Sequence, residues 1–362
     1  MVKRTSLHAV HTEHQAEFCE SAGWDIPGHF GDPDAEYRAV RQGAGILDLG
    51  YHATLFVRGS DRVQFLQGMV SNDVKNLPSG SGCHAALLNL QGKVRTDLWI
   101  YPQEEALRID VHPAGREVLI TTLEKHIISE DVRIEDATDR FGLLSLQGPE
   151  APTVMGKVFP GDLPEKEFQE TVRESAGVQV RLIRRSGYTG EIGFEILAPT
   201  EIVADLWRRF LEGGARPVGA EAFDIFRVEA GVPLVGRDMD ETTLALEAPL
   251  ESAIHLDKGC YIGQEVVARI SFRGHVNRNF VGFRMGEGSV PEVGSRVMAG
   301  EKDVGRVTSS AFSPFLGCPI ALGYIRRETS EPGTQVTVVG PAGPQKAEIA
   351  NLPFFRKKSA DP

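Results

Sequence analysis

The pattern of the chain changes near residues 276–290, and this change limits the possible folds more than any other feature of the sequence. Beyond it, short runs of strand-forming residues are separated by glycine and proline, as in NFVGFRM, PIALGYI and TQVTVVG. Turn residues at this spacing predict a small antiparallel β-barrel. We therefore expect two regions, residues 1–275 and residues 276–362, of which the second is the barrel.

The first region alternates between helix and strand patterns, which predicts an α+β fold. TEIVADLWRRFLEGG has helical spacing, whereas HAALLNLQGKVRTDLWIYP is typical of two strands joined at Gln91-Gly92. A chain of 362 residues is too long for one small core. The first region is therefore expected to hold two α+β subdomains, with the barrel as the third.

Charge and hydropathy exclude several classes of function. The formal net charge of −11 disfavours direct binding to nucleic acid, because contact with phosphates needs a basic surface. An anionic small ligand would need a local basic region, and residues 269–286 contain four arginines and no acid. No run of eighteen apolar residues is present, and residues 1–30 lack the apolar core of a secretory signal. The expectation is a cytoplasmic protein that does not cross a membrane.

Glu195 lies in the segment SGYTGEIGFEI, where glycines allow tight turns and close approach to a ligand. If this segment is a strand, Glu195 points to the face opposite that of Phe194 and Ile196. That face could be exposed to solvent. Alternatively, the carboxylate could accept two hydrogen bonds from a flat 2-amino-pyrimidinone ring.

Arg227 lies in the apolar stretch DIFRVEAGVPL, where an unpaired guanidinium would be costly. One interpretation is a buried ion pair with Glu229 or Asp224. The other is a clamp for a carboxylate or a ring oxygen of a ligand.

Asp97 shares a predicted strand face with the aromatic residues Trp99 and Tyr101. A carboxylate among aromatic rings can take part in proton transfer. The simpler alternative is an acid at a strand edge in contact with water.

Cys260 lies in the segment KGCYIGQE, two residues after Lys258. A nearby ammonium group can make a thiol reactive, although a small buried cysteine near a turn is an equal alternative. The four cysteines are far apart in the sequence, so neither a disulfide framework nor a metal site is expected.

Together these segments resemble the folate-binding family that includes the glycine cleavage aminomethyltransferase (T-protein) and the YgfZ-type proteins. AGWDIPGHF, FLQGMVSNDV and LNLQGKVRTDLWIY follow one another in the order of the T-protein. GYTGEIGFEI is similar to its tetrahydrofolate-binding segment, and FRVEAGVPLVGRDMD is similar to its arginine-bearing strand. The resemblance covers nearly the whole chain, including the predicted barrel.

The resemblance implies three subdomains around a central folate cavity. It implies a catalytic role for Asp97. It also implies that the folate is bound by residues at the family's contact positions, namely Tyr101, Tyr188, Glu195, Arg227 and, where the family has a tyrosine, His84.

Three departures from the T-protein pattern are visible. Residues 50–54 (GYHAT) replace its SHMGK stretch, Thr96 replaces the first acid of an Asp-Asp pair, and KGCYIGQE is similar to the YgfZ signature.

The resemblance leaves two main functions open. The first is transfer of a one-carbon unit from an aminomethyl group on a lipoylated carrier protein to tetrahydrofolate, with release of ammonia. The alternative is a YgfZ-type folate-binding protein that supports iron–sulfur proteins through Cys260, without glycine-cleavage activity. A one-carbon transferase acting on another methylated amine is a third possibility.

Overall fold

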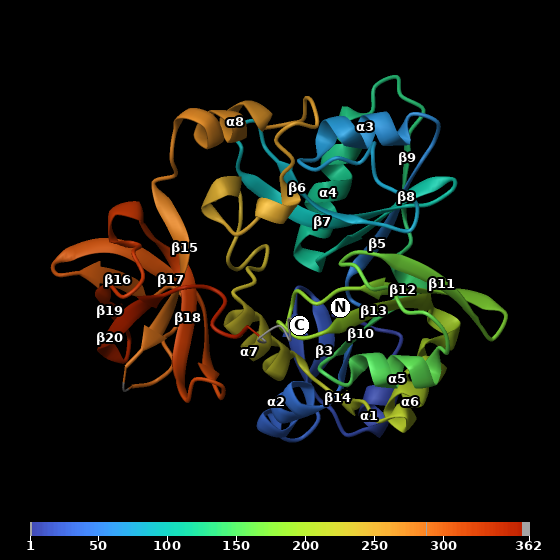
Figure 1. Ribbon diagram of the computed structural model, residues 1–362, viewed down its shortest axis with the longest axis horizontal. Coiled ribbons are helices and arrows are strands. Elements are labelled where there is room, and N and C mark those ends of the chain that lie inside the picture. Colours follow the sequence, from blue (N-terminus) through green and yellow to red (C-terminus); the bar gives the residue numbers. More distant parts are fainter. Residues whose placement is uncertain (1, 287, 357–362) are drawn as a thin grey trace, which may run out of the picture.

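The computed structural model describes residues 2–286 and 288–356. Met1 and residues 287 and 357–362, which the two predicted regions include, lie outside the described part of the chain. Figure 1 shows the barrel on one side of the molecule and the sheets of the first region on the other, with helix α7 between them. Among the described residues, none of the helices is both long and apolar enough to span a bilayer.

The helices mostly lie in the first region of the chain. The α-helices are α1 (His8–Glu13), α2 (Pro33–Gln42), α3 (Arg62–Met69), α4 (Pro113–His126), α5 (Ala151–Val158), α6 (Thr200–Gly213), α7 (Ala220–Ala230) and α8 (Gln264–Arg273). Short 3-10 helices are η1 (Thr138–Arg140), η2 (Ala245–Glu247), η3 (Glu251–Ala253) and η4 (Arg327–Thr329).

A five-stranded antiparallel sheet in the order β6-β7-β8-β5-β9 forms one subdomain. Its strands are β5 (Ala53–Arg58), β6 (Cys83–Leu88), β7 (Val94–Pro102), β8 (Ala106–Val111) and β9 (Arg133–Asp136). Apolar side chains of this sheet pack with those of α3 and α4 into one core. The turn between β6 and β7 contains Gly92 at φ 71, a conformation that favours glycine.

A six-stranded sheet in the order β11-β12-β13-β10-β4-β14 forms the second subdomain, next to a small sheet in the order β1-β3-β2. The strands are β1 (Lys3–Arg4), β2 (Glu17–Ser21), β3 (Trp24–His29), β4 (Gly45–Asp48), β10 (Phe141–Gln147), β11 (Glu170–Ser175), β12 (Val178–Arg184), β13 (Gly193–Pro199) and β14 (Arg216–Pro217). Both faces of the larger sheet are covered. Residues of α5 and α6 form the core on one face, and residues of α2 and α7 form it on the other.

The third subdomain is a closed barrel in the order β15-β18-β17-β16-β19-β20. Its strands are β15 (Arg278–Met285), β16 (Arg296–Ala299), β17 (Lys302–Ser313), β18 (Cys318–Arg326), β19 (Gln335–Gly340) and β20 (Gly343–Ala350). Valines and other alternating apolar residues fill its interior. The predicted fold class, α+β with a small antiparallel barrel as the last of three subdomains, is confirmed.

One element differs from its prediction. The arginine-bearing segment is not a strand but helix α7. Its buried residues Ala222, Phe223 and Phe226 recur at a spacing of three to four and pack on the six-stranded sheet. The helix ends at Gly231, whose φ of 71 is the left-handed conformation typical after a helix.

Candidate active site

A cavity of about 530 Å³ lies between the two α+β subdomains and α7. Its volume is within the usual range for a small-molecule site. It is lined by β2 and β3, by β6 and β7, by the turn at residues 185–188, by α7 and the following loop, and by the segment at residues 249–252. The barrel packs against α7 from the outer side, so it supports this wall without adding side chains of its own to the described lining.

His84, Asp97 and Tyr188 are the sequence-predicted residues that line this cavity. His84 Nε2 lies 2.9 Å from the Oδ2 atom of Asp97 on the neighbouring strand. The His84 ring stacks on Trp99, with 4.8 Å between ring centroids and an interplanar angle of 8°. The Asp97 carboxylate therefore has a fixed imidazole partner at the cavity wall, and the strand-edge alternative is excluded.

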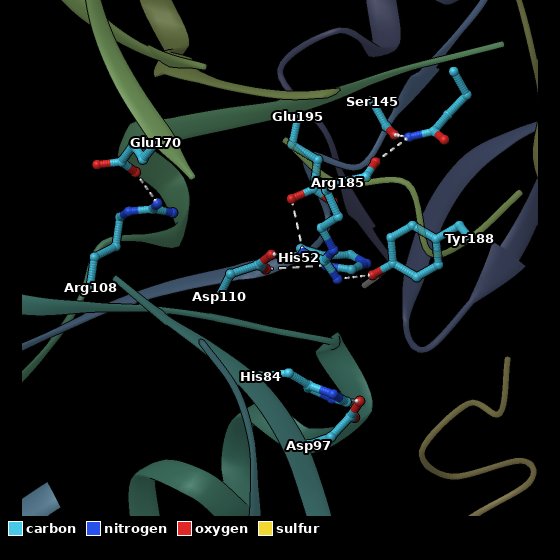
Figure 2. Close-up of polar contacts among 11 residues, drawn as sticks. His52, His84, Asp97, Arg108, Asp110, Ser145, Glu170, Arg185, Tyr188 and Glu195 are labelled. Atoms are coloured by element: carbon cyan, nitrogen blue, oxygen red, sulfur yellow. Dashed lines mark hydrogen bonds and ion pairs between the residues drawn. The ribbon is translucent and has the colours of Figure 1, made fainter. Parts of the chain in front are cut away.

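Arg185 is the main charged residue of the site, and the sequence analysis missed it. Only 2% of this residue is exposed. Its Nη1 atom donates to Asp110 and to Glu195, each at 2.9 Å, and its Nη2 atom donates to the hydroxyl of Tyr188. Its guanidinium lies 3.5 Å from the ring centroid of Trp99. Figure 2 shows Arg185 at the centre of this cluster.

A signal for Arg185 was present in the sequence. The residue directly follows strand β12 and precedes the glycine-rich turn that carries Tyr188. An arginine at the end of a buried strand indicates a buried cation, which acids from other segments have to neutralise. The local sequence pattern does not show which acids these are.

Glu195 is fully buried behind Arg185 and does not belong to the cavity lining. Its Oε1 atom has no hydrogen-bond partner among the described residues. Burial raises the pKa of Glu195 to about 7, with the charge of Arg185 opposing this rise and that of Asp110 adding to it. The solvent-face alternative is thus wrong. Among the described residues, the hydrogen-bond partner of Glu195 that lines the cavity is Arg185.

Two histidines that sequence analysis did not select, His52 and His112, also line the cavity. His52 Nδ1 lies 3.2 Å from Asp110 Oδ1. Burial, together with the nearby charge of His52, lowers the pKa of His112 to about 3, so its imidazole is neutral at pH 7. Burial alone would raise the pKa of Asp110, but the hydrogen bond and charge of His52 and the charge of Arg185 hold it below its usual range.

Arg227 is fully buried, but it lies outside the cavity lining. Its guanidinium donates to four partners, Asp224 at 2.6 Å, the carbonyl of Val232 at 3.1 Å, Asp238 at 3.0 Å and Ser309 of the barrel at 2.7 Å. The interpretation of Arg227 as a ligand clamp therefore needs correction. Of the two predicted ion-pair partners, Asp224 is present, whereas Glu229 pairs with Arg41.

Tyr101 also lies outside the lining, with 1% of the residue exposed. Its ring packs under the guanidinium of Arg108, whose central carbon lies 4.2 Å from the ring centroid. Alternate residues of a strand share a face, yet the cavity extends along β7 only as far as Trp99. The predicted direct contact of Tyr101 with a ligand is corrected for this reason.

Cys260 is exposed and is not part of the cavity lining. The ammonium of Lys258 donates to the carbonyl oxygens of Gln67, Val70 and Asn72 at 2.5 to 2.7 Å. It fastens the chain to the loop after α3, and these three bonds use all of its donors. The alternative of a small buried cysteine is wrong because Cys260 is exposed, whereas its activation by Lys258 stays a prediction.

The basic stretch at residues 269–286 falls on α8 and β15, away from the cavity lining. The cations of the cavity wall are Arg185 and Arg237 instead. In the described part of the chain, no group of three histidine, cysteine or acidic side chains could hold a metal ion.

Comparison with known proteins relates the whole chain to one family. The model of the GCVT N-terminal domain matches residues 7–258, and that of the glycine cleavage T-protein C-terminal barrel domain matches residues 278–356. An aminomethyltransferase of Rubrobacter xylanophilus is 35% identical over 362 residues, with 100% of this chain and 96% of the relative covered. An aminomethyltransferase of a Thermoanaerobacter species is 32% identical over 364 residues, with 98% of each chain covered.

A solved structure has the same fold over its full length. The crystal structure of glycine cleavage system aminomethyltransferase T from Bartonella henselae superimposes with a TM-score of 0.91 at 25% identity, and 99% of each chain is covered. Both domains of the family are thus present in the family's order, which the sequence motifs had predicted. The chain belongs to the glycine cleavage T-protein family.

Proposed function

We propose that this protein transfers a one-carbon unit from an aminomethyl group, carried on the lipoyl arm of a partner protein, to tetrahydrofolate, with release of ammonia. Relatives that match over their full length are named aminomethyltransferases. The observation that carries the proposal to this chain is Asp97, whose carboxylate lines the cavity beside Trp99.

The cavity fits a reduced folate in size and in the chemistry of its walls. Trp99, Tyr188 and Phe223 provide aromatic surface for a flat ring system. Behind them, the Oε1 atom of Glu195 is a buried acceptor that has no partner among the described residues. A pterin carries ring nitrogens and an amino group that can donate to such an acceptor if Arg185 moves aside.

The residues of the chain would hold the two reactants together and accept the proton that the reaction releases. Placing two reactants in one cavity supplies much of the rate by proximity. When bound, the folate supplies the nucleophilic nitrogens. Asp97 accepts a proton at its carboxylate, while Arg185 keeps Asp110 and Glu195 neutralised and fixes the Tyr188 hydroxyl.

The lipoylated carrier is proposed as the partner because the aminomethyl group has to reach a cavity inside the protein. A long flexible arm can deliver it through the mouth near Ser252 and Glu221, both of which line the cavity and are exposed or half-buried. The iron–sulfur alternative receives no support from this site, since Cys260 lies outside the lining.

Ammonia release tests the proposal. The full-length protein is incubated with tetrahydrofolate and an aminomethyl-loaded lipoylated carrier, and ammonia is measured against the same mixture without protein. Wild type should release ammonia in proportion to the amount of carrier. Asp97→Asn should still bind folate, but its rate of ammonia release should be at least about 100-fold lower. A wild-type protein that binds folate but releases no more ammonia than the blank would contradict the proposal.

A further inference from the structure

Three polar side chains from separate segments form a hydrogen-bonded line along the cavity wall. Asp97 Oδ2 lies 2.9 Å from His84 Nε2, and the other ring nitrogen, Nδ1, lies 3.2 Å from the hydroxyl of Ser252. Asp97 is on β7, His84 is on β6 and Ser252 is on η3. Figure 2 shows the His84 ring and the Asp97 carboxylate edge to edge. All three residues line the cavity.

The backbone holds this line in place. The side-chain amide of Asn72 donates to the carbonyl of His84 at 2.6 Å and to the carbonyl of Ser252 at 2.9 Å. One residue earlier, the Ser71 hydroxyl donates to the carbonyl of Ala253 at 2.6 Å and accepts from the backbone of β6. Two consecutive side chains therefore fasten η3 to β6, which sets the distance between His84 and Ser252.

The plane of the His84 ring is also fixed, because it stacks on Trp99 at an angle of 8°. With Asp97 ionised, Nε2 carries the hydrogen and Nδ1 accepts from the Ser252 hydroxyl. A ring in that tautomer can release a proton at one nitrogen while it takes up another at the opposite nitrogen. A histidine that served only in packing would need the stacking on Trp99 but neither of these two bonds.

The line also connects two environments. Asp97 is 9% exposed, whereas Ser252, which also lines the cavity, is exposed to solvent. The imidazole between them is the single side chain that hydrogen-bonds to both within the described part of the chain. Arg185, His52 and His112, which also line the cavity, form no hydrogen bond with His84 among the described residues and belong to the Asp110 cluster.

We propose that His84 is a proton-relay residue of the transfer reaction, which exchanges the proton between Asp97 in the cavity and Ser252 at its opening. This inference rests on the proposed function and assigns one residue to the proton transfer that the reaction requires. In the overall reaction, the carbon–sulfur bond and the carbon–amine bond break, and two carbon–nitrogen bonds form. The two protons lost by the folate nitrogens are equal in number to those gained by the departing thiolate and amine.

The relay moves such a proton without consuming it. The Ser252 hydroxyl passes its proton to Nδ1, Nε2 passes its own proton to Asp97, and Asp97 gives that proton to the departing group. Water at the serine oxygen replaces the proton with one of those lost by the folate. Rotation of the hydroxyl and return of the imidazole proton restore the starting state. No oxidant, metal or further reactant is required.

The first test uses the free protein. Nitrogen-15 NMR of the imidazole rings should show a changed His84 signal in Asp97→Asn and again in Ser252→Ala, because each variant removes the partner of one ring nitrogen. His126, which is bonded to the backbone of α4, serves as the internal control and should not change. A His84 signal that is the same in wild type and in both variants would overturn the relay.

The second test separates the relay from folate binding. His84→Gln should lower kcat for ammonia release about 100-fold, the usual contribution of an acid–base group, while the dissociation constant for tetrahydrofolate changes by less than about threefold. His84→Gly should regain part of the rate when free imidazole is added, and His126→Gln is the matched control with wild-type kcat. Urea unfolding confirms that each variant is folded.

The possible failures can be told apart. An active wild type with an equally active His84→Gln variant overturns the relay alone. Loss of folate affinity in parallel with the rate overturns it too, because His84 would then be a binding residue. A wild type without activity overturns the proposed function, and the relay with it.

Discussion

Arg185 is the residue on which the charge balance of the cavity depends. It is the shared partner of two buried carboxylates, those of Asp110 and Glu195, and it also lies against Trp99. Burial of two acids without a cation between them would be costly. Arg185 therefore supplies the positive charge that lets this acidic chain bury the carboxylates of Asp110 and Glu195 beside the cavity, without a bound ligand.

Replacement of Arg185 by lysine should destabilise the protein. An ammonium group cannot donate in a fixed plane to both acids and to Tyr188, and it stacks less well on an aromatic ring. We expect a loss of about 1–3 kcal/mol in the free energy of unfolding, measured by urea denaturation. The neighbouring, half-buried Arg184 is the control, and Arg184→Lys should change stability much less. Equal effects of the two substitutions would contradict this role of Arg185.

The carboxyl group of Glu195 should make stability depend on pH. Burial raises its pKa to about 7, so folding favours the protonated form. The resulting stabilisation is complete below the unfolded pKa of about 4.5 and is lost as the pH rises through about 7. From about pH 5 to about pH 8, wild type should therefore lose stability relative to Glu195→Gln, at most on the order of 1 kcal/mol per pH unit.

Urea denaturation of wild type and Glu195→Gln across this range measures the effect. The difference between the two proteins cancels the contributions of shared groups that do not interact with Glu195. Asp110, which does interact with it, has a pKa below its usual range and stays ionised from about pH 5 to about pH 8. A difference that stays constant over the range, or that grows in favour of wild type as the pH rises, would show that Glu195 is already ionised in the fold at low pH.

At the scale of single elements, α7 is the connection between the cavity and the barrel. Its Arg227 reaches Ser309 of β17, and Ser309 and Thr308 in turn donate to Asp238 in the loop after the helix. Asp224 and Phe223 of the same helix line the cavity. The barrel therefore acts on the cavity by fixing the position of one helix.

Arg227→Ala should lower the stability of the protein by about 3–5 kcal/mol, because Asp238 would be left buried without its cation. In the folded fraction, the affinity for tetrahydrofolate should stay within about threefold of wild type, since Arg227 does not line the cavity. Thermal unfolding and calorimetric titration measure the two effects. Arg237→Ala, which breaks a partly exposed pair with Asp224, is the stability control and should cost about 1 kcal/mol or less.

The opposite result would support the interpretation of Arg227 as a residue that binds the ligand. If Arg227→Ala kept its stability but lost folate affinity by a factor of ten or more, equivalent to about 1.4 kcal/mol, Arg227 would contact the ligand directly.

Local patterns predicted the elements better than the contacts between them. Turn residues and alternating valines indicate the barrel strands because three of the six strand pairings join strands that are consecutive in the chain. Alternation also placed Glu195 opposite Phe194, but what Glu195 faces is set by Arg185 and Asp110, from other strands. Arg227 shows the same limit, since its partner Ser309 is 82 residues away.

At the scale of the whole molecule, the cavity depends on segments from all of the first region. His84 and Asp97 come from the five-stranded sheet, Arg185 and Tyr188 from the connection between β12 and β13 of the six-stranded sheet, and Ser252 from the segment that precedes the barrel. Such a site forms only when the two subdomains are docked. The family resemblance implied a cavity between three subdomains, whereas its lining comes from the first region alone. The histidine-rich wall could not be predicted from local patterns because His52, His84 and His112 are far apart in sequence.

Occlusion of the cavity tests the central claim that it holds a reduced folate. Gly187 lines the cavity and a Cβ atom added there would meet nothing within 4 Å, so the backbone has room for a side chain and Gly187→Trp is expected to occupy cavity space. Gly156 on α5 has equally open surroundings and lies outside the lining, which makes Gly156→Trp the matched control. In calorimetric titration with tetrahydrofolate, wild type and Gly156→Trp should bind one equivalent alike, and Gly187→Trp should bind at least about tenfold more weakly. Absence of saturable binding in wild type, or unchanged binding in Gly187→Trp, would contradict the claim.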